Sequence, residues 1–418
     1  MKTADLYNTL RHGFAPKTVL AGLALSLVGL CVLGRRDAHT NHLKSFVHFT
    51  MWTSPETKYY PTVNEMMSLV RARTKPGQIV VIVGGNSILR GVGQPPDHIW
   101  TKFLQENLGD GYAVFDFAFD GSGITDGGAV VAEALRREFP RQIYIANAAP
   151  AQAPAPDGSG TYRFVFWDAY YKGLLIDDPA RTAAIVTSNR TAAIENPAGA
   201  PGLRELKARE WLERYLYFQD FWNRVTYDDF NTVWGFYMPG LTGFLRPRKS
   251  YPDPEPDRSL DPIPARYPAA SLAAEMINVR GCSEFTYGTV DATGFHERKD
   301  ASGRWTLYQP KWDEFMAGIK VAMPDVLKPR TLILMSRSSP YYTRLLTPDE
   351  RERDDLAYAH AVEMWKAGGY DSIEYGKNFT ADEFADRTHL TWQGGAKLAA
   401  ATADKVREMS QKIGYLQK

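Results

Sequence analysis

The stretch from Gln78 to Ser87, QIVVIVGGNS, decides the fold of this chain. Its first six residues form a continuous apolar run rich in β-branched side chains, which is typical of a parallel strand buried on both faces. Two glycines and Asn86 then form a tight turn, and Ser87 follows directly. The pattern predicts a buried strand that brings a serine hydroxyl to the carboxyl end of a sheet, where ligands bind in open parallel sheets.

Strand and helix patterns alternate on both sides of this stretch. Further strands are predicted at 112–119, 142–146, 330–335 and 372–375, and helices at 63–73, 97–107, 127–139, 312–327, 348–367 and from 391 to the end. Such alternation predicts an α/β fold, a three-layer α/β/α sandwich around a parallel sheet.

A long interruption separates the two alternating regions. It begins with the Pro/Ala-rich stretch PAQAPAP at 150–156, which signals a turn or linker, and it is rich in aromatic residues. We therefore assign 76–150 and 310–418 to one catalytic domain, 151–309 to an insertion and 38–75 to a connecting segment.

One convincing helix pattern lies inside the insertion, at 203–222. Its aromatic stripe from Trp211 to Trp222 has helical spacing, which is more often part of a core. The alternative is a glycan platform, or a surface that docks on a partner or on lipid.

The N-terminus carries an uncharged apolar run at 18–33, TVLAGLALSLVGLCVL. It is short for a membrane-spanning helix, which needs about 20 apolar residues, but its flanks can extend it. We interpret residues 1–37 as a cytoplasmic tail and a transmembrane signal anchor. A cleaved signal peptide and a lipoprotein signal are the alternatives. An anchor with its N-terminus inside would place a single-pass protein in the inner membrane, with the catalytic domain extracytoplasmic.

Composition excludes several classes of function. The 49 Lys and Arg residues balance 48 Asp and Glu, so nothing indicates a nucleic-acid partner. The two cysteines, Cys31 and Cys282, form no CxxC pair, and His39, His42 and His48 have no cysteine or carboxylate cluster near them, so no metal site is expected. The stretch at 84–93, GGNSILRGVG, fits neither nucleotide-binding template. No cofactor is therefore expected.

Three residue types needed for acyl transfer follow predicted strands. Ser87 follows the first strand, and Asp386 and His389 follow the last. A serine hydroxyl is a weak nucleophile until a base takes its proton, and a histidine can do so near neutral pH. An aspartate three residues before the histidine can hold the imidazole in the required tautomer. These three residues are the predicted catalytic residues.

The negative oxygen that develops in acyl transfer needs preorganised hydrogen-bond donors. Candidates are the backbone N–H groups of Ser87 and of Gly121 or Gly123, and the side-chain amide of Asn147. The glycines also serve the turn after their strand, and Asn147 can equally satisfy backbone groups after its own.

These motifs resemble the SGNH/GDSL hydrolase superfamily. The triplet at 85–87, GNS, is similar to its first block, and the segment at 386–394, DRTHLTWQG, matches the last block D-x-x-H-L-x-x-x-G. Asn147 fits the third block, although Ala148 stands where an aspartate is usual. The resemblance implies a flavodoxin-like sandwich and a serine esterase or acyltransferase.

An N-terminal anchor ahead of such a domain is similar to the D-alanyl transfer protein and to alginate O-acetylation proteins. That layout implies an acyl donor, a glycan or envelope-polymer acceptor and a membrane-bound O-acyltransferase as partner. The sequence leaves hydrolase and transferase open. A non-enzymatic anchored scaffold or polymer-binding protein is the second reading.

Overall fold

Five parallel strands form the central sheet, in the order β2-β1-β3-β6-β7. They are β1 (Ile79–Val83), β2 (Tyr112–Asp116), β3 (Gln142–Ala148), β6 (Thr331–Ser336) and β7 (Asp371–Tyr375). Strands β1, β3 and β6 are buried along their whole length, which explains why most of their residues are apolar. The predicted α/β class with a parallel sheet is confirmed.

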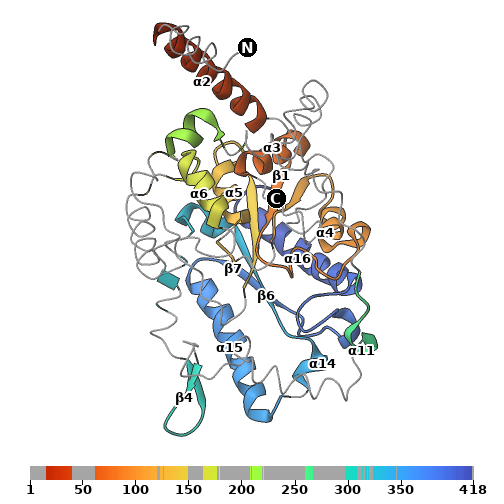
Figure 1. The fold of residues 1–418 in the computed structure, drawn as a ribbon. Coiled ribbons are helices and arrows are strands. Elements are labelled where there is room, and N and C mark those ends of the chain that lie inside the picture. The colour runs from red at the N-terminus through yellow and green to blue at the C-terminus, as the bar shows by residue number, and fades with distance from the viewer. Residues whose placement is uncertain are drawn as a thin grey trace, which may run out of the picture.

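The computed structural model describes most of the two alternating regions and less of the insertion (Figure 1). The described residues are 16–39, 62–119, 123–125, 127–148, 163–176, 178, 208, 210–218, 220, 259–266, 297–307, 313, 316, 317, 319, 323–344 and 346–416.

Helices pack against both faces of the sheet, because alternate residues of each strand point to opposite sides. Val80 and Ile82 of β1 belong to one apolar cluster, together with side chains of α3 (Val63–Arg73), α5 (Gly127–Leu135) and α15 (Pro348–Ala367). Ile79, Val81 and Val83 belong to the other cluster, with α4 (Trp100–Leu108) and α16 (Trp392–Lys412). Helix α3, which falls in the predicted connecting segment, is thus part of the core.

Shorter elements complete the described part of the chain. They are η1 (Pro96–His98), α6 (Arg163–Tyr171), the π-helical turn η2 (Leu212–Leu216), α11 (Ile263–Arg266), the antiparallel hairpin of β4 (Glu297–Lys299) and β5 (Trp305–Leu307), η4 (Asp325–Arg330), α14 (Pro340–Thr343) and η5 (Ala381–Glu383).

Three predicted elements differ in extent from the structure. The helix predicted at 97–107 is divided into η1 and α4, because Ile99 between them is extended (φ −77°, ψ 144°). The strand predicted at 112–119 leaves the ladder after Asp116, and its Phe119 N–H bonds to the Gly85 carbonyl in the turn after β1 at 2.9 Å. The helix predicted at 127–139 ends at Leu135, ahead of Pro140.

Two helix predictions fall partly outside the described residues. They are the helix at 312–327 and the helix at 203–222. Of the aromatic stripe in the second, Trp211, Tyr215 and Phe218 are described, and they are 49 %, 54 % and 43 % exposed. The interpretation of the stripe as core is wrong for these three, because their side chains are exposed and belong to neither apolar cluster of the sheet.

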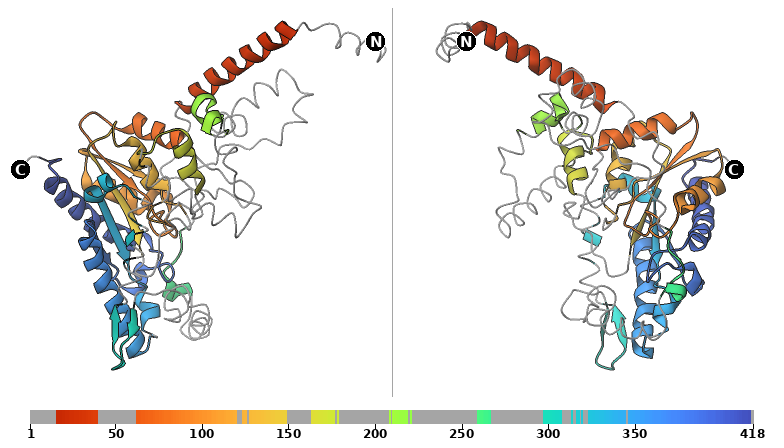
Figure 2. Two further views of the ribbon diagram at one scale, coloured as in Figure 1. Left: turned by 90° about the vertical axis from the view of Figure 1, so that its left-hand side faces the viewer. Right: turned by 45° about the vertical axis from the view of Figure 1, so that its right-hand side comes forward.

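That N-terminal helix, α2 (Pro16–Ala38), is 23 residues long. At about 1.5 Å per residue it exceeds the roughly 30 Å of a hydrocarbon core. Among the described residues it is the one helix long and apolar enough to cross a membrane. Figure 2 shows it projecting from the body, and its apolar side chains are largely exposed.

Candidate active site

Ser87 lies just beyond the carboxyl end of β1, where the sequence places it. Gly84 and Gly85 carry the chain away from the strand, and Gly85 has a positive φ of 91°, a conformation that favours glycine. Ser87 is half-buried.

Asp386 and His389 lie on one tight loop between η5 and α16. Its ends are closed by a bridge between Phe384 and Leu390 and by a hydrogen bond from Ala385 N–H to the His389 carbonyl at 2.9 Å. One carboxylate oxygen of Asp386, Oδ1, accepts the backbone N–H groups of Thr388 (2.9 Å) and His389 (2.8 Å). The aspartate therefore organises the turn that carries the histidine.

The structure joins the three predicted catalytic side chains in one chain of hydrogen bonds. Asp386 Oδ2 lies 2.6 Å from His389 Nδ1, and His389 Nε2 lies 2.8 Å from Ser87 Oγ. The serine and the histidine are 302 residues apart in sequence. The predicted proximity of the three side chains is confirmed, and their catalytic role stays a prediction.

The charge on Asp386 suits this arrangement. Burial raises the pKa of its carboxyl, but the hydrogen bond and charge interaction with His389 and the two backbone N–H groups outweigh that effect, so its pKa is lowered from its ordinary value. An ionised Asp386 accepts the proton of His389 Nδ1, which leaves Nε2 as the acceptor for the Ser87 hydroxyl. The geometry is therefore suited to proton removal from Ser87.

Asn147, a predicted oxyanion donor, is bonded to the turn that carries the nucleophile. Its Oδ1 accepts the backbone N–H of Asn86 at 3.0 Å, and its Nδ2 donates to Asn86 Oδ1 at 2.8 Å. Asn86 Oδ1 also accepts the N–H of Ile88 at 3.0 Å. Since Asn147 is only 2 % exposed, these contacts give it a positioning role in the structure.

The two glycine candidates are placed less completely. Gly121 lies outside the described residues. Gly123 belongs to the short described segment 123–125, which the Tyr144 hydroxyl holds by donating to the Ile124 carbonyl at 2.7 Å. Their contribution to an oxyanion site stays a prediction.

Gly85→Ala is expected to impair the candidate active site by more than the backbone strain that an alanine with a positive φ would cause. A Cβ at this position would collide with Asn147 Oδ1, and so would push away the amide that holds Asn86. We expect labelling of Ser87 by a fluorophosphonate to slow at least tenfold, measured as the rate of fluorescent adduct formation.

Gly77→Ala is the matched control. Gly77 has a similar positive φ of 84° but no atom within 4 Å of the added Cβ. Both variants carry a strain of about 1–2 kcal/mol in the left-handed region, and only Gly85→Ala adds a clash at the site. Equal labelling rates for the two variants would contradict the positioning role of Asn147.

The supports that hold the loop at 384–390, the candidate catalytic loop, were not predicted from the sequence. Ile263 of α11 donates its N–H to the Phe384 carbonyl at 2.8 Å, and Ser339, the N-cap of α14, donates its N–H to the Arg387 carbonyl at 2.7 Å. Figure 1 shows α11 and α14 at the end of the body far from α2. Neither contact has a local pattern that could have revealed it, because each joins segments distant in the chain.

No metal centre is found in the part of the chain that the structure describes: no group of three or more His, Cys, Asp or Glu residues there could hold a metal ion. Of the three juxtamembrane histidines, His39 is described, and His42 and His48 lie outside the described residues.

No protein-family model matches this chain, and no curated protein matches it either. Function has therefore to be inferred from the geometry of the site.

Proposed function

We propose that this chain is a membrane-anchored serine acyltransferase or esterase of the SGNH type, built as a three-layer α/β/α sandwich. The observation that supports it best is the continuous chain of hydrogen bonds from Asp386 through His389 to Ser87. This is the order in which a carboxylate orients an imidazole and the imidazole activates a serine hydroxyl. The packing of helices on both faces of the sheet agrees with the sandwich.

The proposed reaction proceeds through an acyl-enzyme. Ser87 Oγ attacks the carbonyl carbon of an acyl ester while its proton passes to His389 Nε2. The tetrahedral intermediate then collapses, the bond to the leaving alcohol breaks, and that alcohol takes the proton from His389. Water or an acceptor hydroxyl next gives its proton to His389 Nε2 and attacks the acyl carbon. The bond between that carbon and Ser87 Oγ then breaks, Oγ takes the proton back from His389, and the free acid or the new ester is released.

Donors for the negative oxygen are proposed from the backbone. The N–H of Ser87 and that of Gly121 or Gly123 are the candidates. Asn147 donates one amide hydrogen to Asn86 and retains a second one. It is a further candidate donor, and it would act from its present buried position.

We further propose that α2 is an uncleaved signal anchor in the inner membrane, with the catalytic domain extracytoplasmic. The close packing of α2 against the insertion supports a retained helix: a Cβ at Gly34 would collide with the Leu216 carbonyl. In that setting the acceptor is a glycan or another envelope polymer, and a membrane-bound O-acyltransferase is the proposed partner that supplies acyl groups.

A fluorophosphonate probe tests the proposal. We expect the full-length wild type in detergent to be labelled, and labelling of Ser87→Ala to fall at least 100-fold, because the probe reacts only with an activated serine. Ser302→Ala is the control, since Ser302 lies in the exposed turn between β4 and β5. The mass of the acyl-enzyme formed with candidate donors would then identify the acyl group.

One observation favours a second candidate, an anchored scaffold or polymer-binding protein without efficient chemistry. The Asn147 amide is bonded to Asn86, and Ala148 stands where the SGNH pattern has an aspartate. A folded wild type that resists the probe would favour this second candidate over the enzyme.

A further inference from the structure

Three exposed aromatic side chains gather around η2, in the described part of the insertion. Trp211, Tyr215 and Phe218 are each more than two-fifths exposed, and the rings of Trp211 and Tyr215 lie 6.0 Å apart. We call these three residues the aromatic belt. Large exposed aromatic groups are unusual at the surface of a soluble domain and mark an interaction surface when they are contiguous.

The segment that carries the aromatic belt lies against the carboxyl-terminal end of α2. Cys31 Sγ donates to the Tyr215 carbonyl at 2.6 Å, and the ring of His39 meets Tyr217 edge-on with 6.2 Å between centroids. Gly34 allows the close approach, because any side chain there would collide with the Leu216 carbonyl. If α2 crosses the hydrocarbon core of a bilayer, the belt therefore lies at the depth where the helix ends and the headgroup region begins.

Charge at the same level fits a lipid headgroup region. Arg35 and Arg36 occupy the last turn of α2 and are exposed. Just before them, Val32 and Leu33 are 62 % and 41 % exposed and continue the apolar surface of the helix. Along α2, apolar surface comes first, then the aromatic rings, then the two cations. This is the order in which a bilayer presents its acyl chains, its interface and its phosphate groups.

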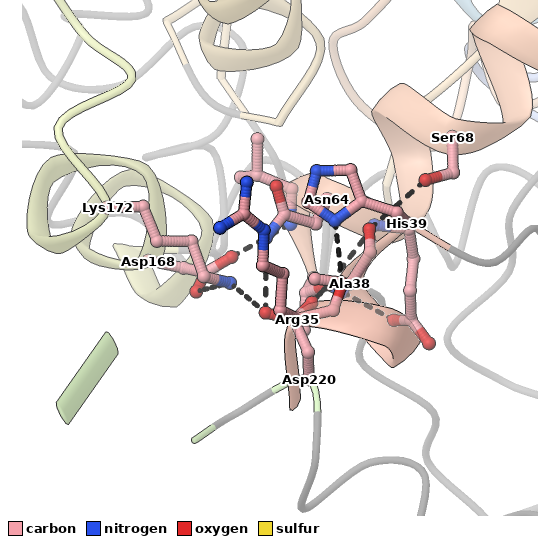
Figure 3. Close-up of polar contacts among 11 residues, drawn as sticks. Arg35, Ala38, His39, Asn64, Ser68, Asp168, Lys172 and Asp220 are labelled. Carbon is pink, nitrogen blue, oxygen red and sulfur yellow. Dashed lines mark hydrogen bonds and ion pairs between the residues drawn. The ribbon is translucent and has the colours of Figure 1, made fainter. Parts of the chain in front are cut away.

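The aromatic belt is also tied firmly to the body of the protein. Asp220, two residues after the belt, accepts hydrogen bonds from Thr62 Oγ1 at 2.6 Å and Asn64 Nδ2 at 3.1 Å, and it pairs with Lys172 Nζ at 2.8 Å. Ser68 of α3 donates to the Ala38 carbonyl at the end of α2 at 3.2 Å. Figure 3 shows these contacts gathered where α2 meets α3 and α6.

We propose that the aromatic belt inserts into the lipid interface and holds the body at a fixed orientation on the bilayer. Continuity with the exposed apolar surface of α2 identifies lipid as the occupant, and the contacts of Asp220 transmit the orientation to the sheet. The catalytic loop is bonded to α11 and next to α14, at the end of the body far from α2, so in this orientation it lies away from the membrane (Figure 1). Acceptors in solution or in the polymer layer reach it there.

Quenching of tryptophan emission by brominated lipid tests the belt. The full-length protein is reconstituted into phosphatidylcholine and phosphatidylglycerol vesicles with and without bromine at carbons 6 and 7 of one acyl chain. The difference spectrum between wild type and Trp211→Phe isolates one of the ten tryptophans. We expect that difference to lose more than half of its intensity in the brominated vesicles.

Trp392→Phe is the matched control, because Trp392 is 42 % exposed at the start of α16, beside the catalytic loop. Its difference spectrum should be the same in both kinds of vesicle. A Trp211 difference that bromine leaves unchanged would overturn the proposal, and a protein partner covering the belt would give that result. Trp211→Tyr replaces the phenylalanine variant if the latter does not fold. This test is independent of the proposed acyl chemistry. Bromine can quench Trp211 even in a protein whose Ser87 is not labelled by the fluorophosphonate.

Discussion

Asp386→Asn is expected to fold normally and to lose about four orders of magnitude in acyl-ester turnover. The asparagine keeps Oδ1, which accepts the N–H groups of Thr388 and His389, so the loop retains its shape. Its new amide would face His389 Nδ1 and donate to it. The imidazole would then carry its proton on Nε2, and it could not accept the proton of Ser87.

Turnover of a chromogenic acyl ester, with thermal unfolding measured in parallel, checks this expectation. Asp382→Asn is the control, because it makes the same chemical change on the exposed η5 turn four residues earlier. The assignment of Asp386 fails if the Asp386→Asn variant turns over the ester at nearly the wild-type rate while remaining folded.

Lys172→Met is expected to lower the free energy of unfolding by about 3–5 kcal/mol. Lys172 Nζ lies 2.5 Å from Asp168 Oδ1 and 2.8 Å from Asp220 Oδ2, and all three side chains are at least nine-tenths buried. Without the lysine, two carboxylates would face each other with no cation between them. Denaturant unfolding of the full-length chain in detergent measures the loss.

The pH dependence of this variant gives a second readout. Burial raises the pKa of the Asp168 carboxyl, and loss of the Lys172 charge would raise it further. A carboxyl with a higher pKa in the folded than in the unfolded state takes up a proton on folding. The variant should therefore regain stability relative to wild type as the pH falls toward that pKa.

Two further variants distinguish the effect of leaving buried carboxylates without a cation from the effect of losing any lysine. Lys299→Met removes a lysine whose ion pair with Asp349 is exposed at both ends, and should cost far less stability than Lys172→Met. Adding Asp220→Asn to Lys172→Met removes one of the opposed carboxylates and should recover part of the loss. A Lys172→Met protein as stable as Lys299→Met would show that the buried charges need no cation.

The sequence predicted best those elements whose ends are marked by residues close to them in the chain. Helix α15 begins and ends where the sequence placed it, because Thr347 and Glu350 form a capping box and Pro348 occupies the first helical position. Strand β1 was recognisable from its uninterrupted β-branched run. The pairing of Asp386 with His389 could be foreseen because both residues belong to one turn.

Contacts between distant segments had no such signal. The bond between Asn86 and Asn147 depends on β1 and β3 being neighbours, a strand order that periodicity does not encode. The exposure of Trp211 depends on how its segment docks on α2, through the Tyr215 carbonyl, whereas helical spacing alone is equally compatible with a core. In both cases the deciding interaction spans tens to hundreds of residues.

The 302 residues between Ser87 and His389 bear on when the proposed acyl chemistry becomes possible during synthesis of the chain. The turn with Ser87 is complete once β1 and β3 have paired, but its hydroxyl has no base until the chain has been made as far as residue 389. A ribosome-bound intermediate therefore presents an ordinary serine alcohol. Any acyl chemistry must wait until the polypeptide is almost finished and its two halves have come together.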